Sequence, residues 1–266
     1  MLIQIFYFCV RMKTMANSKR PIEVLIISDI HLGTFGSSAK ELNQYLNSID
    51  PAKIIINGDW IDIWNFNMNY WPEEHSENIF IILDFIKQGK PVYYVTGNHD
   101  DDIRKFSGFI FSSFNVVDEL DLELDGKKYW VLHGDKYDQS VGGNARKLAQ
   151  FGGRIYDYSI RVNRKVNDSL VKLGGKRVMV SKMVKDRVKK IVKSRVADFE
   201  LLTCDEGIKR GYDSVICGHV HKPQDRIVKT ENGTIRYLNS GDWVENCTAL
   251  EYNNGEWTIF KYYDNF

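Results

Sequence analysis

Short runs of apolar and β-branched residues recur along the chain and predict strands that are buried on both faces. Five such runs lie at residues 22–28, 53–57, 91–96, 129–133 and 213–217. Apolar residues at helical spacing follow the first two runs. They predict one helix that starts with the capping-box pattern Ser38 to Glu41, and a second helix at 76–87 that ends before Gly89. Strands and helices therefore alternate, which is typical of an α/β fold.

Turn sequences predict additional antiparallel pairing. Asp125-Gly126 is a strong two-residue turn signal, and it predicts a hairpin between the runs at 118–124 and 128–132. Three further runs near the C-terminus predict another antiparallel set, and they lie at 234–239, 247–252 and 257–262.

The segment 138–210 has a different pattern. Pairs of glycines interrupt helical stretches, and apolar residues recur at helical spacing from Val180 to Phe199. Between Asn144 and Arg195 there are 16 Lys or Arg residues against three Asp residues, so this stretch is strongly basic. We therefore predict a non-structural N-terminal extension at 1–20, a core formed by 21–137 and 211–266, and a helical cap insertion at 138–210.

Composition excludes several classes of protein. Hydrophobic residues make up 43% and charged residues 27%, as in soluble globular proteins, and the net charge of +1 gives no global attraction to nucleic acid or membranes. The four cysteines are scattered, which disfavours a zinc ribbon or a disulfide framework and fits a reduced cytoplasm. The apolar stretch 2–10 is too short to span a bilayer. We interpret residues 1–14 as an over-extended start, with a short membrane-touching segment as the alternative.

Five of the six histidines lie in short polar motifs that directly follow predicted strands. The motifs are Ser-Asp29-Ile-His31, Gly-Asn98-His99-Asp100, His133-Gly-Asp135 and Gly-His219-Val-His221, and Gly-Asp59-Trp-Ile-Asp62 follows another strand in the same way. Ligands of open α/β sheets bind at the carboxyl ends of the strands. These side chains are therefore expected to converge on one site.

Such a set of side chains indicates bound metal. Several carboxylates and imidazoles packed together without a cation would be destabilised by desolvation and repulsion. Two divalent ions at a spacing of about 3.5–4 Å remove this penalty, and one carboxylate can bridge them. Mixed His, Asp and Asn ligands suit Mn²⁺, Fe or Zn²⁺ better than Ca²⁺. Each motif alone is a weak signal, but five in order after strands are hard to obtain by accident.

As a set, these motifs resemble the five signature blocks of the calcineurin-like metallophosphoesterase superfamily. The resemblance implies a four-layer α/β/β/α sandwich with a basic helical insertion and two metals at one edge. It implies that Asp29, His31, Asp59 and His221 hold one metal. It also implies that Asp59, Asn98, His133 and His219 hold the other, with Asp59 as the bridge. Mn²⁺ is the expected metal, and Fe or Zn²⁺ are the alternatives.

A second set of sequences resembles one branch of this superfamily. Cys217-Gly-His-Val-His-Lys-Pro223, the stretch Asn239-Ser-Gly-Asp-Trp-Val-Glu-Asn-Cys-Thr-Ala-Leu250 and the basic insertion are similar to the UDP-2,3-diacylglucosamine pyrophosphatases. That branch cleaves a lipid-linked nucleotide sugar in lipid A synthesis and releases UMP and an acylated sugar phosphate. The chain departs from some members, because His99 follows Asn98 where those members have arginine.

The resemblance leads to a mechanistic hypothesis in which a metal-bridging hydroxide attacks phosphorus. His99 is expected to stabilise the developing charge or to protonate the leaving oxygen, and Asp62 to orient His99. For Asp62, a turn-capping role is an equally weighted alternative. Asp100 is expected to support the site from behind.

The basic insertion has three interpretations. The first is a solvated helical face. The second is contact with anionic lipid or a cover for a lipid substrate, and the third is binding of nucleic acid. The lipid interpretation is favoured, and the nucleic-acid interpretation is disfavoured. Arg154, Arg161, Arg164 and Arg177 are candidate substrate-binding residues. The expected location is the cytoplasm, with peripheral contact at the inner face of the membrane. The aromatic residues around Trp60, Trp64 and Trp71 are assigned to packing rather than to a nucleobase platform.

Two other functions remain open at this point. One is a metallophosphoesterase with another substrate, such as a phosphomonoester, a cyclic nucleotide or a nucleic acid phosphodiester. The other is a non-catalytic binding module, which the complete set of ligand residues disfavours.

Overall fold

Two β-sheets form the centre of the protein. The computed structural model describes residues 19–66, 69–138 and 198–266. The larger sheet has the strand order β12-β11-β1-β2-β3-β5-β4. Its strands are β1 (Arg20–Ile27), β2 (Ile49–Asn57), β3 (Val92–Val95), β4 (Ile110–Phe111), β5 (Phe114–Val117), β11 (Thr248–Asn253) and β12 (Glu256–Lys261). Strands β1, β2, β3 and β5 are parallel, so their carboxyl ends lie at one edge of the sheet.

The smaller sheet has the order β6-β7-β8-β10-β9. Its strands are β6 (Glu119–Leu124), β7 (Lys127–Leu132), β8 (Ser214–Cys217), β9 (Gln224–Thr230) and β10 (Gly233–Asn239). Strands β7, β8 and β10 are parallel. The hairpin between β6 and β7 turns at Asp125-Gly126, where both residues have positive φ, as the sequence predicts.

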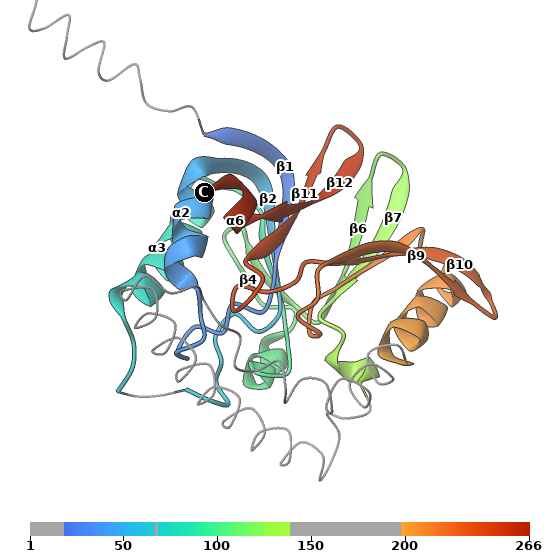
Figure 1. Ribbon diagram of the computed structural model, residues 1–266, viewed down its shortest axis with the longest axis horizontal. Coiled ribbons are helices and arrows are strands. Elements are labelled where there is room, and N and C mark those ends of the chain that lie inside the picture. The colour runs from blue at the N-terminus through green and yellow to red at the C-terminus, as the bar shows by residue number, and fades with distance from the viewer. Residues whose placement is uncertain (1–18, 67–68, 139–197) are drawn as a thin grey trace, which may run out of the picture.

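Helices cover the outer faces of both sheets (Figure 1). Helices α2 (Ala39–Ser48) and α3 (Glu73–Lys87) pack on the larger sheet. A helix at 198–209 packs on the smaller sheet through Phe199 and Cys204. Short helical segments complete the described elements, namely η1 (Asp101–Phe106), η2 (Asp135–Tyr137) and α6 (Tyr262–Asn265).

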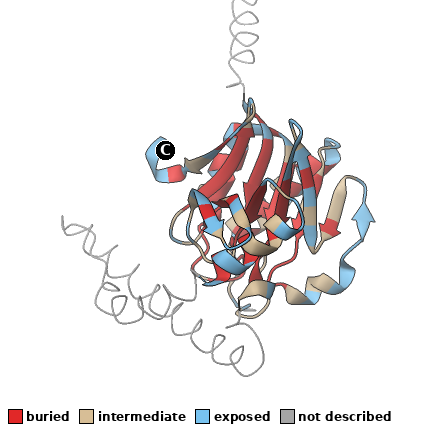
Figure 2. Ribbon diagram, turned by 90° about the vertical axis from the view of Figure 1, so that its right-hand side faces the viewer, coloured by how far each residue is buried: buried red, intermediate tan, exposed pale blue. Residues whose placement is uncertain are grey.

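Alternating side chains along the strands build the three apolar layers between these elements. In β1, Leu25 and Ile27 face α2 and α3, whereas Ile26 faces the smaller sheet, where it packs in one cluster with Val131 and Ile216. The central strands are consequently buried on both faces (Figure 2). The predicted four-layer α/β/β/α sandwich is confirmed. The helix at 198–209 belongs to its outermost layer, so we narrow the proposed cap to residues 139–197, which lie outside the described residues.

Two local predictions are wrong. Ser38 does precede α2 and donates its hydroxyl to the Val244 carbonyl at 3.3 Å, but the side chain makes no capping bond, because its backbone (φ −93°, ψ 48°) lacks the extended conformation of an N-cap. The C-terminal strands do not form one antiparallel set. Strands β11 and β12 pair with each other, whereas β10 lies in the other sheet, because the long connection after Asn239 lets the chain change sheets.

No helix in the described part of the chain is long and apolar enough to cross a membrane.

Candidate metal centre

Loops at the carboxyl ends of five strands bring the predicted ligands to one edge of the two sheets. Asp29 and His31 follow β1, Asp59 follows β2, Asn98 follows β3, His133 follows β7, and His219 and His221 follow β8. Backbone hydrogen bonds join the loops directly. The Asp29 amide donates to the Gly58 carbonyl at 3.1 Å, and the Gly218 amide donates to the His133 carbonyl at 3.1 Å.

The backbone is strained where the ligands are presented. Among the described residues, nine non-glycine residues have positive φ, and five of them are predicted ligands: Asp29, His31, Asp59, His219 and His221. Residues other than glycine rarely adopt this left-handed backbone conformation. Such residues cluster at functional sites, where the surrounding structure holds the backbone in the strained conformation. After β1, β2 and β8, this conformation therefore turns the chain sharply where the ligand side chains enter the site.

Glycines let these loops approach one another closely. A Cβ atom on Gly97 would lie 2.2 Å from Oδ1 of Asp59, and one on Gly58 would lie 2.2 Å from Nδ1 of His133. A Cβ on Gly218 would lie 2.7 Å from Oδ2 of Asp29. These distances are far below van der Waals contact, so the loops can pack only with glycine at these positions.

Four of the predicted ligands form one half of the cluster. Nε2 of His31 lies 3.3 Å from Nε2 of His221, 4.0 Å from Oδ1 of Asp29 and 3.8 Å from Oδ2 of Asp59. Nε2 of His221 lies 3.2 Å from Oδ1 of Asp29. The nitrogen and oxygen atoms of these residues that could bind a metal thus face a common point.

Asp59 also belongs to the second half. Its Oδ2 lies 3.3 Å from Nε2 of His133. Oδ1 of Asn98 lies 3.3 Å from the same nitrogen and 2.9 Å from Nδ1 of His219. One oxygen of Asp59 therefore lies between the two halves, where a bridging ligand would be needed.

The chemistry of this set fits divalent cations. Asp29 and Asp59 are buried, and Oδ1 of Asp29 receives no hydrogen bond from any described residue. Three of the histidines make outer contacts that leave one ring nitrogen for the site. Nδ1 of His31 faces Asp62 at 3.0 Å, Nδ1 of His133 donates to the Asn57 carbonyl at 2.8 Å, and Nε2 of His219 faces Asp138 at 2.9 Å. Such outer partners fix the ring orientation of metal-ligating histidines.

The pKa shifts show that the site stabilises positive charge. Burial raises the pKa of Asp29, but His221 and His133 lower it, and the result is about 2. Burial likewise raises the pKa of Asp59, and His133 and His99 bring it well below its usual range. Burial lowers the pKa of His221, whereas Asp29 raises it, to about 9. Cations placed between these carboxylates would supply the same compensation.

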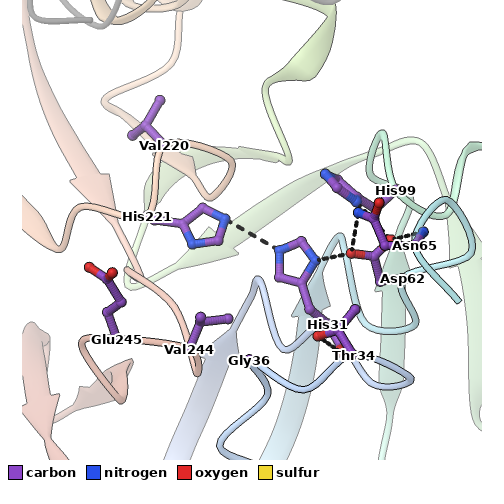
Figure 3. A pocket seen from close by; sticks show the side chains of 10 residues that line it. All are labelled: His31, Thr34, Gly36, Asp62, Asn65, His99, Val220, His221, Val244 and Glu245. Carbon is purple, nitrogen blue, oxygen red and sulfur yellow. Dashed lines mark hydrogen bonds and ion pairs between the residues drawn. The ribbon is translucent and has the colours of Figure 1, made fainter. Parts of the chain in front are cut away.

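A hollow of about 300 Å³ opens beside the first half of the cluster (Figure 3). His31, His221 and His99 reach into it from three different loops. Asp62 lies beneath them, and its two carboxylate oxygens lie 3.0 Å from Nδ1 of His31 and 2.9 Å from Nδ1 of His99. The Asn65 amide also donates to Asp62 at 2.8 Å. Asp62 thus contacts both a predicted ligand and the predicted proton donor.

His99 is held on two sides. The Trp64 ring lies against it with centroids 4.6 Å apart, and the His31 ring meets it edge-on at 4.7 Å. Burial lowers the pKa of His99, but Asp59 and Asp62 raise it above its usual value. Trp60 lies in the apolar cluster between the larger sheet and its helices, and Trp71 packs against that cluster.

The remaining predicted residues lie elsewhere. Asp100 is buried behind the site, where it accepts hydrogen bonds from the Trp60 and Gly97 amides and from the Tyr94 hydroxyl. It supports the loops and does not line the hollow. Arg154, Arg161, Arg164 and Arg177 lie outside the described residues.

Sequence reasoning missed two carboxylates that contact the histidines. Asp242 accepts the amides of Val244 and Asn246, and its Oδ2 lies 3.9 Å from Nδ1 of His221. Its signal is the Ser-Gly-Asp sequence after β10, which repeats the pattern of a polar motif after a strand. Asp138 is the other residue, and no local pattern marks it.

Comparison with known proteins identifies a family whose sequence profile covers most of the chain. Residues 22–223 match the sequence profile of the family described as calcineurin-like phosphoesterase. The UDP-2,3-diacylglucosamine hydrolase of Aliivibrio fischeri (strain MJ11) is 23% identical over 253 residues, which cover 90% of this chain and 98% of that protein. The protein of the same name from Vibrio cholerae serotype O1 (El Tor Inaba N16961) is 24% identical over 87% of this chain and 95% of its own. Among solved structures, Yfce, a phosphoesterase from E. coli, aligns over 91% of this chain and 94% of its own, with 13% identity and a TM-score of 0.44.

Proposed function

This chain belongs to the calcineurin-like phosphoesterase family and is a metal-dependent hydrolase, and from that premise we propose that it cleaves the pyrophosphate bond of a lipid-linked nucleotide sugar. The proposed substrate is UDP-2,3-diacylglucosamine or a close analogue, and the products are UMP and an acylated sugar phosphate. The similarity to hydrolases named for that substrate over nearly the full length of both chains carries the proposal.

The proposed metal centre uses all seven predicted ligands. Asp29, His31 and His221 would hold one ion, Asn98, His133 and His219 the other, and Asp59 both. When bound, two divalent cations supply an activated water as the nucleophile and neutralise charge on the phosphate. Mn²⁺ is the favoured metal because the donors mix imidazole nitrogen with carboxylate and amide oxygen, which Fe and Zn²⁺ also accept.

His99 is the proposed general acid. It lines the hollow beside the cluster, and its raised pKa favours the protonated form that an acid needs. Asp62 and Trp64 hold its ring, so its remaining nitrogen is available to the leaving oxygen of a substrate bound between His99 and His221. Protonation of that oxygen would help the pyrophosphate bond to break.

A lipid-linked substrate places the enzyme at a membrane surface. The strongly basic sequence between Asn144 and Arg195 favours contact with anionic headgroups at the cytoplasmic face, and Arg154, Arg161, Arg164 and Arg177 within it are candidates for the substrate phosphates. We propose that residues 139–197 act as the cap over the site.

The test is incubation of the Mn²⁺-loaded protein with UDP-2,3-diacylglucosamine in detergent micelles, beside a phosphomonoester, a cyclic nucleotide and single-stranded DNA. We expect UMP release from the lipid alone. His133→Ala should reduce this release to the level of metal-free protein, because His133 contacts Asp59 and Asn98 from the centre of the cluster.

If the lipid is not cleaved and the phosphomonoester is cleaved rapidly, the proposed substrate is wrong but the phosphoesterase activity stands. Unchanged turnover in His133→Ala, with its fold verified by circular dichroism, would contradict the proposed metal centre itself.

A further inference from the structure

Arg104, within η1, does not line the hollow and is not one of the seven predicted ligands. Its guanidinium contacts carboxylates from three segments of the chain. One Nη atom lies 2.8 Å from Asp101, the other lies 2.9 Å from Asp135, and Nε lies 2.8 Å from Asp118. Nε also lies 3.2 Å from the Thr96 hydroxyl.

These contacts join two of the loops that carry the second half of the metal centre, those of Asn98 and His133. Thr96 and Gly97 immediately precede Asn98, and the Gly97 carbonyl accepts from Arg104 at 3.5 Å. Asp135 stands two residues after His133, at the start of η2, which follows β7 of the smaller sheet. The atoms that these loops present, Oδ1 of Asn98 and Nε2 of His133, are 3.3 Å apart.

We infer that Arg104 is a positioning residue that fixes the Asn98 loop against the His133 loop and so sets the geometry of one of the two metal sites. The inference rests on the proposed two-metal centre and names a residue outside it. Arg104 acts through Gly97 and Asp135 and does not touch the reacting atoms.

The guanidinium suits this task for two physical reasons. Its rigid planar fork holds five donors in fixed directions, whereas the lysine ammonium has three donors on one compact, rotatable group. It also compensates Asp135, whose side chain is only 8% exposed. Burial lowers the pKa of Arg104, but Asp135, Asp118 and Asp101 raise it above its usual value, so the charge is retained. Without this partner, Asp135 would be a buried, uncompensated charge beside the His133 loop.

The other half of the centre is held by different groups. The Trp243 amide donates to the Asp29 carbonyl at 3.0 Å, and Asn246 donates to the His221 carbonyl at 2.9 Å. Asp62 holds His31. None of these contacts involves Arg104. Loss of Arg104 should therefore weaken one metal site and spare the other.

The experiment measures uptake of Mn²⁺ alone by the full chain, using equilibrium dialysis and elemental analysis over a range of metal concentrations. We expect two ions per wild-type chain. In Arg104→Gln, one of them should bind about 10–100-fold more weakly, the range seen when outer partners of metal ligands are removed. The other ion should bind within about twofold of wild type.

Two further variants make the result specific. Arg236→Gln is the matched control, because Arg236 also pairs with a carboxylate, that of Asp225, at similar exposure, but lies on β10 away from the site. It should bind both ions as wild type does. Asn98→Ala removes a proposed ligand of the affected ion, so adding Arg104→Gln to it should cause little further loss.

Equal weakening of both ions, or no change in either, would overturn the inference. If Arg104→Gln does not fold, Asp135→Asn decides, because it removes the same link from the other side and should weaken the same single ion. No substrate is used, so a wrong substrate assignment leaves the inference standing. A wild-type chain that takes up fewer than two ions would instead refute the metal centre on which the proposed function depends.

Discussion

At the scale of single residues, Asp62 contributes to two proposed roles, metal binding and proton transfer. It contacts His31, a proposed ligand, and His99, the proposed acid. His99→Gln should lower kcat by about 10²–10⁴-fold and leave Mn²⁺ uptake unchanged, because only proton transfer is lost. Asp62→Asn should lower both kcat and Mn²⁺ affinity. Steady-state kinetics beside metal dialysis distinguishes these outcomes, and equal metal binding in the two variants would contradict the dual contact.

His75 predicts a pH dependence of stability that is separate from catalysis. It is buried between Tyr70 and Trp71, its Nδ1 accepts from the Gly33 amide at 3.0 Å, and burial lowers its pKa to about 4. The folded state therefore favours neutral His75, so this contribution is complete above pH 6.5 and is lost as the pH falls from 6.5 to 4. The shift corresponds to at most about 3 kcal/mol.

The check is urea unfolding of wild type and His75→Asn at pH 7 and pH 4.5, since asparagine keeps the acceptor but does not titrate there. The wild type should lose more of its free energy of unfolding between the two pH values than the variant does. An equal loss would show that His75 does not carry the effect.

At the scale of elements, the close packing of the turns after the strands positions the proposed metal ligands. Gly97 does not have a positive φ, so alanine is tolerated by its backbone, but its Cβ would lie 2.2 Å from Oδ1 of Asp59. Gly97→Ala should therefore displace Asp59 and weaken Mn²⁺ uptake, measured by dialysis.

Gly89→Ala is the matched control for this prediction. Gly89 has φ +77°, and a Cβ atom there would meet no neighbouring atom within 4 Å, so alanine is strained but does not clash. The substitution should cost about 1–2 kcal/mol of stability and leave metal uptake unchanged. A normal metal stoichiometry in Gly97→Ala would show that the loops can move apart without harm.

At the scale of the whole molecule, the proposed cap and the core can be separated experimentally. The described residues that flank the cap lie near one residue, because Asp138 lies 2.9 Å from Nε2 of His219 and the Phe199 ring lies 5.7 Å from the His219 ring. A Gly/Ser linker of about six residues is long enough to replace 139–197. The resulting protein should bind Mn²⁺ and cleave a small phosphoester.

The same protein should lose most of its kcat/KM for UDP-2,3-diacylglucosamine, if the removed residues bind the lipid. Parallel assays with both substrates measure this selectivity. Retention of full activity on the lipid would contradict a role of the cap in substrate recognition.

The sequence alone determined the α/β class, and the resemblance of its motifs to a known family implied the four-layer architecture and the chemical class. Strands buried on both faces need continuous apolar runs, and turns such as Asp125-Gly126 need residues that accept positive φ, so both leave local signals. The five polar motifs led to the family, which the sequence comparison confirms, and to a cluster that the structure brings together at one sheet edge. The roles of the seven ligands remain predictions.

Only the tertiary structure decided which distant groups support that cluster. The Ser38 hydroxyl donates to the Val244 carbonyl, and β10 pairs with β8 in the smaller sheet, and both partners lie far along the chain or outside the local pattern. Arg104, Asp138 and Asp242 likewise have no local pattern that assigns them a partner. Hydrogen bonds and ion pairs depend on distance in space, which sequence spacing does not specify once the chain folds back on itself.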